Sequence, residues 1–317
     1  MGRYKEADLS GIKRHSITKR ASKVKLANLA KAPAPAKPLA VFLDSLPDIL
    51  KARDLRQLAA DIAQARKRKR NVILMMGAHP IKCGLSPVLL DLVDRGYVTA
   101  VALNGAGAIH DFELACFGRT SEDVAQGLAD GSFGMAAETA DLINGAVIAG
   151  DAEDLGFGEA LGLFLNEEKA RHREVSLLAH CYRRKIPVTV HVGIGTDIIH
   201  QHPSFDGAAA GNASHRDFRI MAQVVSKLSG GVVLNIGSSV VLPEVFLKTL
   251  TVARNLGHPV KNFTAANFDM VQHYRANTNV VQRPVQCGGK GYSFTGHHEI
   301  MVPLLAALVK RVGRKGK

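Results

Sequence analysis

Residues 99–111 read TAVALNGAGAIHD, a short apolar run that breaks into a glycine-rich turn and then into helix-compatible sequence. An apolar strand that stops at Asn104-Gly105-Ala106-Gly107 leaves backbone N–H groups open to a pyrophosphate or a ribose. The third glycine of the G-x-G-x-x-G dinucleotide fingerprint is absent, because His110 stands in its place. The stretch therefore predicts either a nucleotide-binding turn or a strand-to-helix turn that only packs tightly.

Apolar runs and helical patterns alternate on both sides of this turn. Expected strands are 71–76, 99–104, 186–192, 230–237 and 260–266. Expected helices are 45–68, 87–94, 243–255 and several within 121–184. Strands that are apolar on both faces and separated by helices are typical of parallel sheets. The sequence thus predicts an α/β fold with a doubly wound, mostly parallel, Rossmann-like sheet.

The N-terminal part has a different composition from the rest. Residues 32–38 read APAPAKP, which is typical of a stiff linker. We therefore expect a basic arm and linker over 1–38 and a single α/β domain over 39–317. Such an arm can lie across a neighbouring subunit instead of folding by itself.

The net charge of +13 is concentrated in three segments. Residues 1–37, 66–70 and 310–317 carry +8, +5 and +5, so the remainder of the 317-residue chain is net negative. Basic residues in tails and at a helix end usually form a solvated face. This distribution argues against nucleic acid as the main partner and leaves RNA binding by the arm as an alternative.

Cysteine use and hydropathy suggest the compartment. Cysteines 83, 116, 181 and 287 form no C-x-x-C pair and fit reduced thiols. No run approaches the roughly eighteen apolar residues that span a membrane, and no signal-peptide core follows the first methionine. We expect a cytoplasmic protein with no membrane partner.

Polar residues gather directly after the expected strands. They are Thr196, Asp197, His200, His202, Asp206, Gly237, Ser238, Ser239, Asn267, Asp269 and His273. Ligands of open parallel sheets bind beyond the carboxyl ends of the strands, so we expect one site built from several loops. The histidines and carboxylates of 197–206 suit general-base chemistry. Their spacing matches no standard zinc site, and we assign no metal.

Five segments, 84–112, 185–197, 230–241, 263–269 and 296–309, together resemble deoxyhypusine synthases. The resemblance spans about residues 40–310 and implies a Rossmann-like fold, NAD as cofactor and a homotetramer. It also implies transfer of a butylamine group from spermidine to a protein lysine. The implied cofactor contacts are Gly84, Asn104, Gly105, Ala106, Gly107, His110, Asp111, Gly237, Ser238, Ser239, Thr264, Ala265, Asp269, His297 and His298.

The chain departs from this family where the family's chemistry lies. The family lysine belongs to a Trp-Gly-Lys segment, but this chain has no tryptophan and its matching column falls near Arg283-Pro284. An arginine cannot form an imine. We therefore expect NAD-dependent dehydrogenation of a small amine or alcohol.

The candidate general bases are Asp197, His200 and His202, with Glu244 in reserve. One alternative is aminobutyl transfer of the deoxyhypusine or homospermidine synthase type, with Lys290 as the imine-forming residue. Another alternative is a non-catalytic protein that binds a nucleotide, RNA or a partner.

Overall fold

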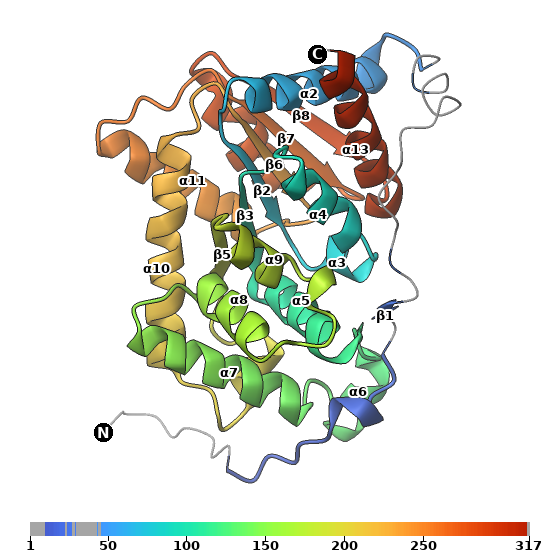
Figure 1. The fold of residues 1–317 in the computed structure, drawn as a ribbon, viewed down its shortest axis with the longest axis vertical. Helices are drawn as coiled ribbons and strands as arrows, with labels where there is room; N and C mark the ends of the chain where they lie inside the picture. The colour runs from blue at the N-terminus through green and yellow to red at the C-terminus, as the bar shows by residue number, and fades with distance from the viewer. Residues whose placement is uncertain (1–9, 23, 27–28, 30–42, 44–45, 316–317) are drawn as a thin grey trace.

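The computed structural model describes residues 10–22, 24–26, 29, 43 and 46–315. Its centre is a six-stranded, all-parallel sheet of order β5-β3-β2-β6-β7-β8 (Figure 1). The strands are β2 (Val72–Met76), β3 (Ala100–Asn104), β5 (Val188–His191), β6 (Val232–Ile236), β7 (Thr264–Asp269) and β8 (Lys290–Thr295). Counted along the chain, this is the 3-2-1-4-5-6 order of Rossmann folds. The predicted fold class is confirmed.

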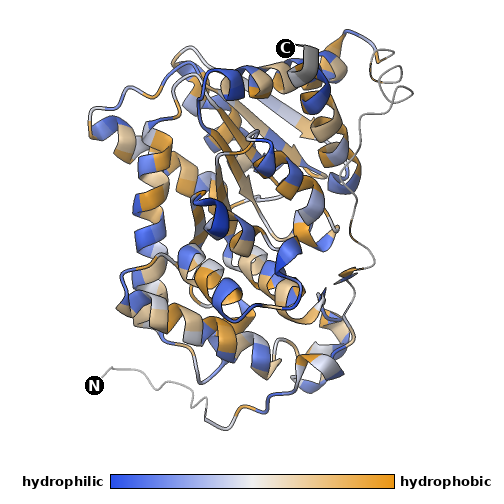
Figure 2. Ribbon diagram, in the orientation of Figure 1, coloured by the Kyte–Doolittle hydropathy of each residue, from blue (hydrophilic) through white to orange (hydrophobic). Residues whose placement is uncertain are grey.

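Helices cover both faces of the sheet, as the burial of β2 illustrates. Val72, Leu74 and Met76 join one apolar core, whereas Ile73 and Met75 join the other, because successive side chains of a strand point to opposite faces. One core is covered by α2 (Leu50–Lys67), α4 (Ser86–Asp94) and α13 (His298–Lys315). The other is covered by α10 (Gly207–Ser226) and α11 (Val241–Asn255). Figure 2 shows these central strands as largely hydrophobic.

The remaining elements lie around this sandwich. Helices α5 to α8 gather at the end of the sheet formed by β5 (Figure 1). The further helices are α3 (His79–Lys82), α5 (Gly105–Phe117), α6 (Val124–Asp130), α7 (Ala137–Ala152), α8 (Phe157–Glu167), α9 (Leu177–Arg184) and α12 (Tyr274–Ala276). Short turns of other helix types are η1 (Ile17–Lys19), η3 (Arg173–Val175), η4 (Ile198–Gln201), η5 (Asn277–Gln282) and η6 (Pro284–Gln286). A small antiparallel pair joins β1 (Val24–Lys25) to β4 (Arg119–Thr120).

Membrane-spanning character is absent from the described helices, since none of them is both long and apolar enough to cross a bilayer.

One expected strand begins later than predicted, and one observed strand has no counterpart among the expected ones. The run 260–266 is not a strand throughout, because Val260 and Asn262 adopt positive φ and make a turn, so that β7 begins at Thr264. Strand β8 was not expected from the sequence. Only Phe294 among its six residues is buried, so β8 lacks the apolar run that marks the other strands.

The carboxyl group of Asp217 holds three elements together. Asp217 is fully buried on α10, and its Oδ2 accepts hydrogen bonds from the backbone N–H of Gly158 on α8 (2.9 Å) and of Val190 on β5 (2.7 Å). Burial raises the pKa of Asp217 to about 8, against the opposing effect of these two N–H groups. The carboxyl group therefore keeps its proton in the folded protein at neutral pH.

The free energy of unfolding is expected to fall as the pH rises from about 4 to about 8. The folded protein holds the Asp217 proton up to its pKa of about 8, whereas the unfolded chain releases it near 3.8. Unfolding releases a proton in this window, so a higher pH favours unfolding. Asp217→Asn keeps an acceptor oxygen and should remove this part of the pH dependence, a few kcal/mol in size. Thermal unfolding of both proteins across this window checks it, and equal pH slopes would contradict it.

Candidate functional site

Two glycines meet where the strand order reverses. Gly77 follows β2 and Gly237 follows β6, and the N–H of Gly77 donates to the carbonyl of Ile236 (3.2 Å). A Cβ on Gly77 would lie 2.3 Å from the carbonyl oxygen of Gly237. Gly237 itself has φ +66°, and a Cβ there would lie 2.7 Å from Cε1 of His298. Gly77 and Gly237 therefore pack backbone to backbone, and a side chain at either position would clash with the chain itself. Open parallel sheets bind ligands at such a reversal of strand order, and the region between the carboxyl ends of β2 and β6 is called the crevice below.

Polar side chains border this crevice. His298 is 1% exposed, and its Nε2 lies 3.1 Å from the carbonyl oxygen of Phe268. Its Nδ1 is buried and finds no hydrogen-bond partner among the described residues. The ring of His79 packs against it edge-on, with ring centroids 5.3 Å apart. Asp269, 8% exposed, ends β7, and its Oδ1 accepts from the N–H of Met270 (2.8 Å). The crevice thus offers one unpartnered imidazole nitrogen and one carboxylate.

Electrostatics keeps two of the neighbouring groups neutral. Burial lowers the pKa of His79, and the nearby His298 and Lys82 lower it further. Burial also raises the pKa of the Cys83 thiol to about 11, with a further contribution from the Glu299 carboxylate. At neutral pH, therefore, His79 is an uncharged imidazole and Cys83 is a thiol.

The glycine-rich turn of 104–107 begins α5, next to the crevice. The side-chain oxygen of Asn104 caps this helix by accepting from the N–H of Gly107 (2.8 Å). A Cβ on Gly107 would lie 3.7 Å from the carbonyl carbon of Gly77, so the turn and the crevice adjoin. A Cβ on Gly105 would lie 1.9 Å from Oδ2 of Asp197. A carboxylate of the chain itself thus lies over the turn that the sequence predicts for a pyrophosphate.

A pocket of about 210 Å³ opens beside this turn. Its ionisable lining consists of Arg20, Lys82, His110, Glu113, Glu122 and Asp197. Burial lowers the pKa of His110 to about 4, so its ring is uncharged at neutral pH. Burial raises the pKa of Asp197 to about 6, and its buried Oδ2 has no hydrogen-bond partner among the described residues. Three carboxylates against two cations make the pocket net negative at neutral pH.

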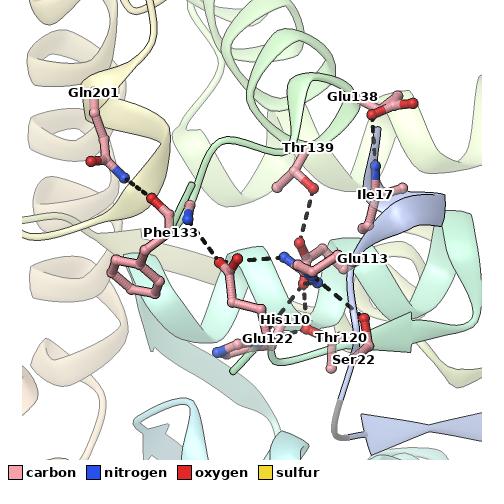
Figure 3. A network of polar contacts seen from close by, with 12 residues as sticks. Ile17, Ser22, His110, Glu113, Thr120, Glu122, Phe133, Glu138, Thr139 and Gln201 are labelled. Atoms are coloured by element: carbon pink, nitrogen blue, oxygen red, sulfur yellow. Dashed lines mark hydrogen bonds and ion pairs between the residues drawn. The ribbon is translucent and has the colours of Figure 1, made fainter. Parts of the chain in front are cut away.

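A buried ion network forms one wall of the pocket (Figure 3). Glu113 is fully buried and accepts from Arg20 (2.9 Å), from Thr139 (2.9 Å) and from Thr120. Arg20 also lies 3.7 Å from Glu122. Arg20 and Glu113 are both almost fully buried. If one of them were removed, water could not solvate the charge of the other.

The N-terminal segment brings Arg20 to this wall. His15 exchanges backbone hydrogen bonds with the start of α7, donating to Met135 (2.7 Å) and accepting from Ala137 (2.8 Å). The side chain of Ile17 is fully buried, and its N–H donates to Glu138 (3.0 Å). Residues 15–20 therefore pack on the body of their own chain. The linker of 32–38 lies outside the described residues.

Asp111 lies in the core, away from the crevice. It is fully buried, and its carboxyl oxygens accept from Oγ of Ser176 (2.5 Å) and from the N–H groups of Leu177 (2.8 Å) and Leu178 (3.1 Å). These contacts cap the first turn of α9. These contacts indicate a structural role for Asp111, whereas the family resemblance implies a cofactor contact.

Thr264, Ala265 and Lys290 lie at the opposite edge of the sheet from the crevice. Thr264 and Lys290 are paired first residues of β7 and β8, and both contact the Asp61 carboxylate, at 2.9 and 3.6 Å. Ala265 is buried in the core. At about 3.3 Å per residue, five steps along β7 separate Thr264 from Asp269 by about 16 Å. The expected single site therefore divides, with Asp269 at the crevice and Lys290 away from it.

The predicted bases other than Asp197 have local roles. Nδ1 of His200 accepts from the N–H of Gly195 (3.0 Å) and of Asp197 (3.2 Å), which shapes the loop. His202 is buried, with its Nε2 2.8 Å from the Gly134 carbonyl oxygen. Glu244 is held by two cations and an amide, in contacts with Lys248, Arg275 (3.2 Å) and Asn279 (2.8 Å).

The remaining implied cofactor residues are Ser238, Ser239, Gly84 and His297. The hydroxyl of Ser238 accepts from the N–H of Leu242 (3.2 Å) in the first turn of α11, while Ser239 beside it is half-buried. Gly84 links α3 to α4 with φ +75°. His297 is 65% exposed and lies 3.8 Å from Glu299. Of these four residues, Ser238 is the one whose side chain makes a hydrogen bond that stabilises a helix start.

Several residues of the crevice and pocket are absent from the sequence-based site, namely Gly77, Arg20, Lys82, Glu113 and Glu122. Gly77 carries a usable signal, because it directly follows the apolar run 71–76. The others carry none, since Arg20 and Glu113 are 93 positions apart and meet only in the folded chain.

The fold and the switch-point crevice define a Rossmann-like α/β protein. No family model matches the chain. No curated protein matches it either. Solved structures do match. A "conserved putative LOR/SDH protein" from Methanococcus maripaludis S2 aligns with a TM-score of 0.54 and 17% identity, covering 83% of this chain and 71% of that one. AgrE in a ternary complex with ornithine and NAD+ aligns with a TM-score of 0.52 and 15% identity, covering 81% of this chain and 32% of that one.

A third match is a "putative deoxyhypusine synthase" from Entamoeba histolytica, the family that the sequence motifs resemble. It has a TM-score of 0.49 and 10% identity, over 88% of this chain and 96% of that one. At these identities the matches concern the fold. The chain spans about two thirds of the LOR/SDH protein's length and about a third of AgrE's.

Proposed function

We propose that this protein binds NAD in the crevice between β2 and β6 and dehydrogenates a small amine held in the pocket beside α5. The observation that carries the proposal is the strand order of the parallel sheet, which reverses between β2 and β6. Rossmann-like sheets bind dinucleotides at this point. The shared fold of AgrE, solved with ornithine and NAD+, supports the proposal.

The residues at the crevice fit this cofactor. The carboxylate of Asp269 can accept both hydroxyls of a ribose, and the unpartnered Nδ1 of His298 can hydrogen-bond to a polar group in the crevice. The first turn of α5 is less suited to a pyrophosphate, because Asp197 already lies over it. When bound, NAD supplies an acceptor for a hydride.

The pocket fits a cationic substrate. Its net negative lining favours an ammonium group over a neutral alcohol or an anion. Asp197 is the residue placed to accept a proton from that substrate, because it lines the pocket and its carboxyl group has a pKa of about 6. Lys82 lines the pocket from α3, the helix whose His79 borders the crevice, so that pocket and crevice adjoin.

The two alternatives receive less support from the geometry. Aminobutyl transfer through Lys290 would require an imine far from the crevice, at a side chain that is 54% exposed and lies 3.6 Å from Asp61. RNA binding by the arm would need basic groups that can reach phosphates, and among the arm's described residues Arg14 and Arg20 are already paired with Asp141 and Glu113.

Calorimetric titration of the full-length protein with NAD tests the cofactor half of the proposal. We expect one site per chain, and we expect Asp269→Asn to weaken binding by about tenfold to a hundredfold, since hydrogen bonds to a charged group contribute about 1.5–3 kcal/mol. Asp154→Asn, at a carboxylate that is 93% exposed, is the matched control and should bind as the wild type does. Absence of binding, or equal affinity of the Asp269 variant, would refute the proposed cofactor site.

A further inference from the structure

We propose that His79, Cys83 and Glu299 form a binding site for a divalent transition-metal ion of the zinc type. One ligand atom from each side chain lies within 4.8 Å of the other two. His79 begins α3 and Cys83, four positions later, is its C-cap, so one helical turn presents both on the same side. Glu299 comes from the first turn of α13, which packs against α3.

The distances suit a tetrahedral ion. Zinc lies about 2.0–2.3 Å from nitrogen, oxygen and sulfur ligands, which places tetrahedral ligand atoms roughly 3.5 Å apart. Sγ of Cys83 and Oε2 of Glu299 are already 3.6 Å apart. The longest separation between the three ligand atoms, at most 4.8 Å, would have to shorten by about 1 Å to reach this value. The Glu299 side chain is 49% exposed and has room to rotate.

The donor set selects the class of ion. An imidazole, a thiolate and a carboxylate together suit zinc and similar borderline ions, whereas magnesium and calcium prefer oxygen ligands alone. Three protein ligands leave a fourth tetrahedral position for water or for a heteroatom of a substrate, as in catalytic zinc sites.

A second observation lies beside the cluster. His298 is 1% exposed, packs edge-on against His79 and keeps an unpartnered Nδ1. The buried His298 ring thus supports the position of the His79 ring. The carboxylate of Asp269 acts electrostatically on His79 and adds negative charge near the site. The competing interpretation is a simple thiol to carboxylate hydrogen bond between Cys83 and Glu299.

Titration of the chelator-treated full-length protein with Co²⁺ distinguishes these interpretations. We expect one Co²⁺ per chain, a thiolate-to-cobalt charge-transfer band in the near ultraviolet and the visible bands of a tetrahedral ion. Cys83→Ser should abolish the charge-transfer band and weaken binding by at least about tenfold. Cys287→Ser, at an exposed thiol outside the cluster, is the matched control and should leave both unchanged.

Glu299→Gln keeps the experiment decisive if the Cys83 variant fails to fold, because the exposed Glu299 side chain has little part in the core. It should weaken Co²⁺ binding and retain the charge-transfer band. No stoichiometric binding by the wild type, or a charge-transfer band that persists in a folded Cys83→Ser protein, would overturn the proposal. The Co²⁺ titration contains no dinucleotide, so a negative result would not bear on the proposed NAD site. The NAD titration is run with chelator present, so its result would not bear on the proposed metal site.

Discussion

Asp197→Asn is expected to lower kcat/KM for NAD-dependent amine oxidation by about 10²- to 10⁴-fold, the usual contribution of a general base. Wild-type activity should rise with pH through about 6, because burial raises the pKa of Asp197 to that value and only the ionised carboxylate can accept a proton. The variant should show no such rise. Absorbance of the reduced cofactor, followed with a panel of diamines and basic amino acids across this pH range, provides the measurement.

Asp206→Asn is the matched control for this prediction. Asp206 lies in the same loop region, nine positions along the chain, but it caps α10 by accepting from the N–H groups of Ala208 and Ala209. Asparagine caps helices as well as aspartate does, so this variant should keep both rate and pH profile. A folded Asp197→Asn protein with the wild-type rate, or with the same inflection near pH 6, would remove Asp197 as the base.

Arg20→Ala is expected to lower the free energy of unfolding by about 3–5 kcal/mol, as removal of one partner of a buried ion pair usually does. Glu113 is fully buried, and without Arg20 its charge keeps only hydroxyl partners, Thr120 and Thr139. Urea unfolding at constant pH measures the change. The same variant should open the pocket wall and weaken substrate binding, which the activity assay reports separately.

Arg14→Ala provides the comparison for an exposed ion pair. Arg14 and Asp141 also join the N-terminal segment to α7, but their side chains are 33% and 44% exposed, so the loss should stay within about 1 kcal/mol. The double variant Arg20→Ala with Glu113→Gln should recover part of the lost stability, because it removes the unpaired buried charge. If Arg20→Ala is no more destabilising than Arg14→Ala, the ion network does not anchor the segment.

The two ends of β7 show what a sequence motif can and cannot predict about a site. The segment 263–269 carries Thr264 and Asp269 in one motif, and proximity along the chain suggested one shared site. A strand crosses the whole sheet, however, so its two ends lie at opposite edges, about 16 Å apart. Asp269 therefore borders the crevice, whereas Thr264 contacts Asp61 at the far edge. The sequence predicts a strand here. Which residues stand at its amino end and which at its carboxyl end depends on the residue at which the strand begins.

The sequence by itself determined the class of fold, because doubly apolar runs such as 71–76 and 99–104 can be buried only between two helical layers. It also placed the glycine turn of 104–107 at the start of a helix. The tertiary structure alone decided what occupies that turn, since Asp197 arrives there from the loop after β5. It likewise brought Arg20 to Glu113, and Glu299 to His79 and Cys83. Local periodicity reports which face of an element is buried, whereas meetings between distant side chains follow from how the layers pack.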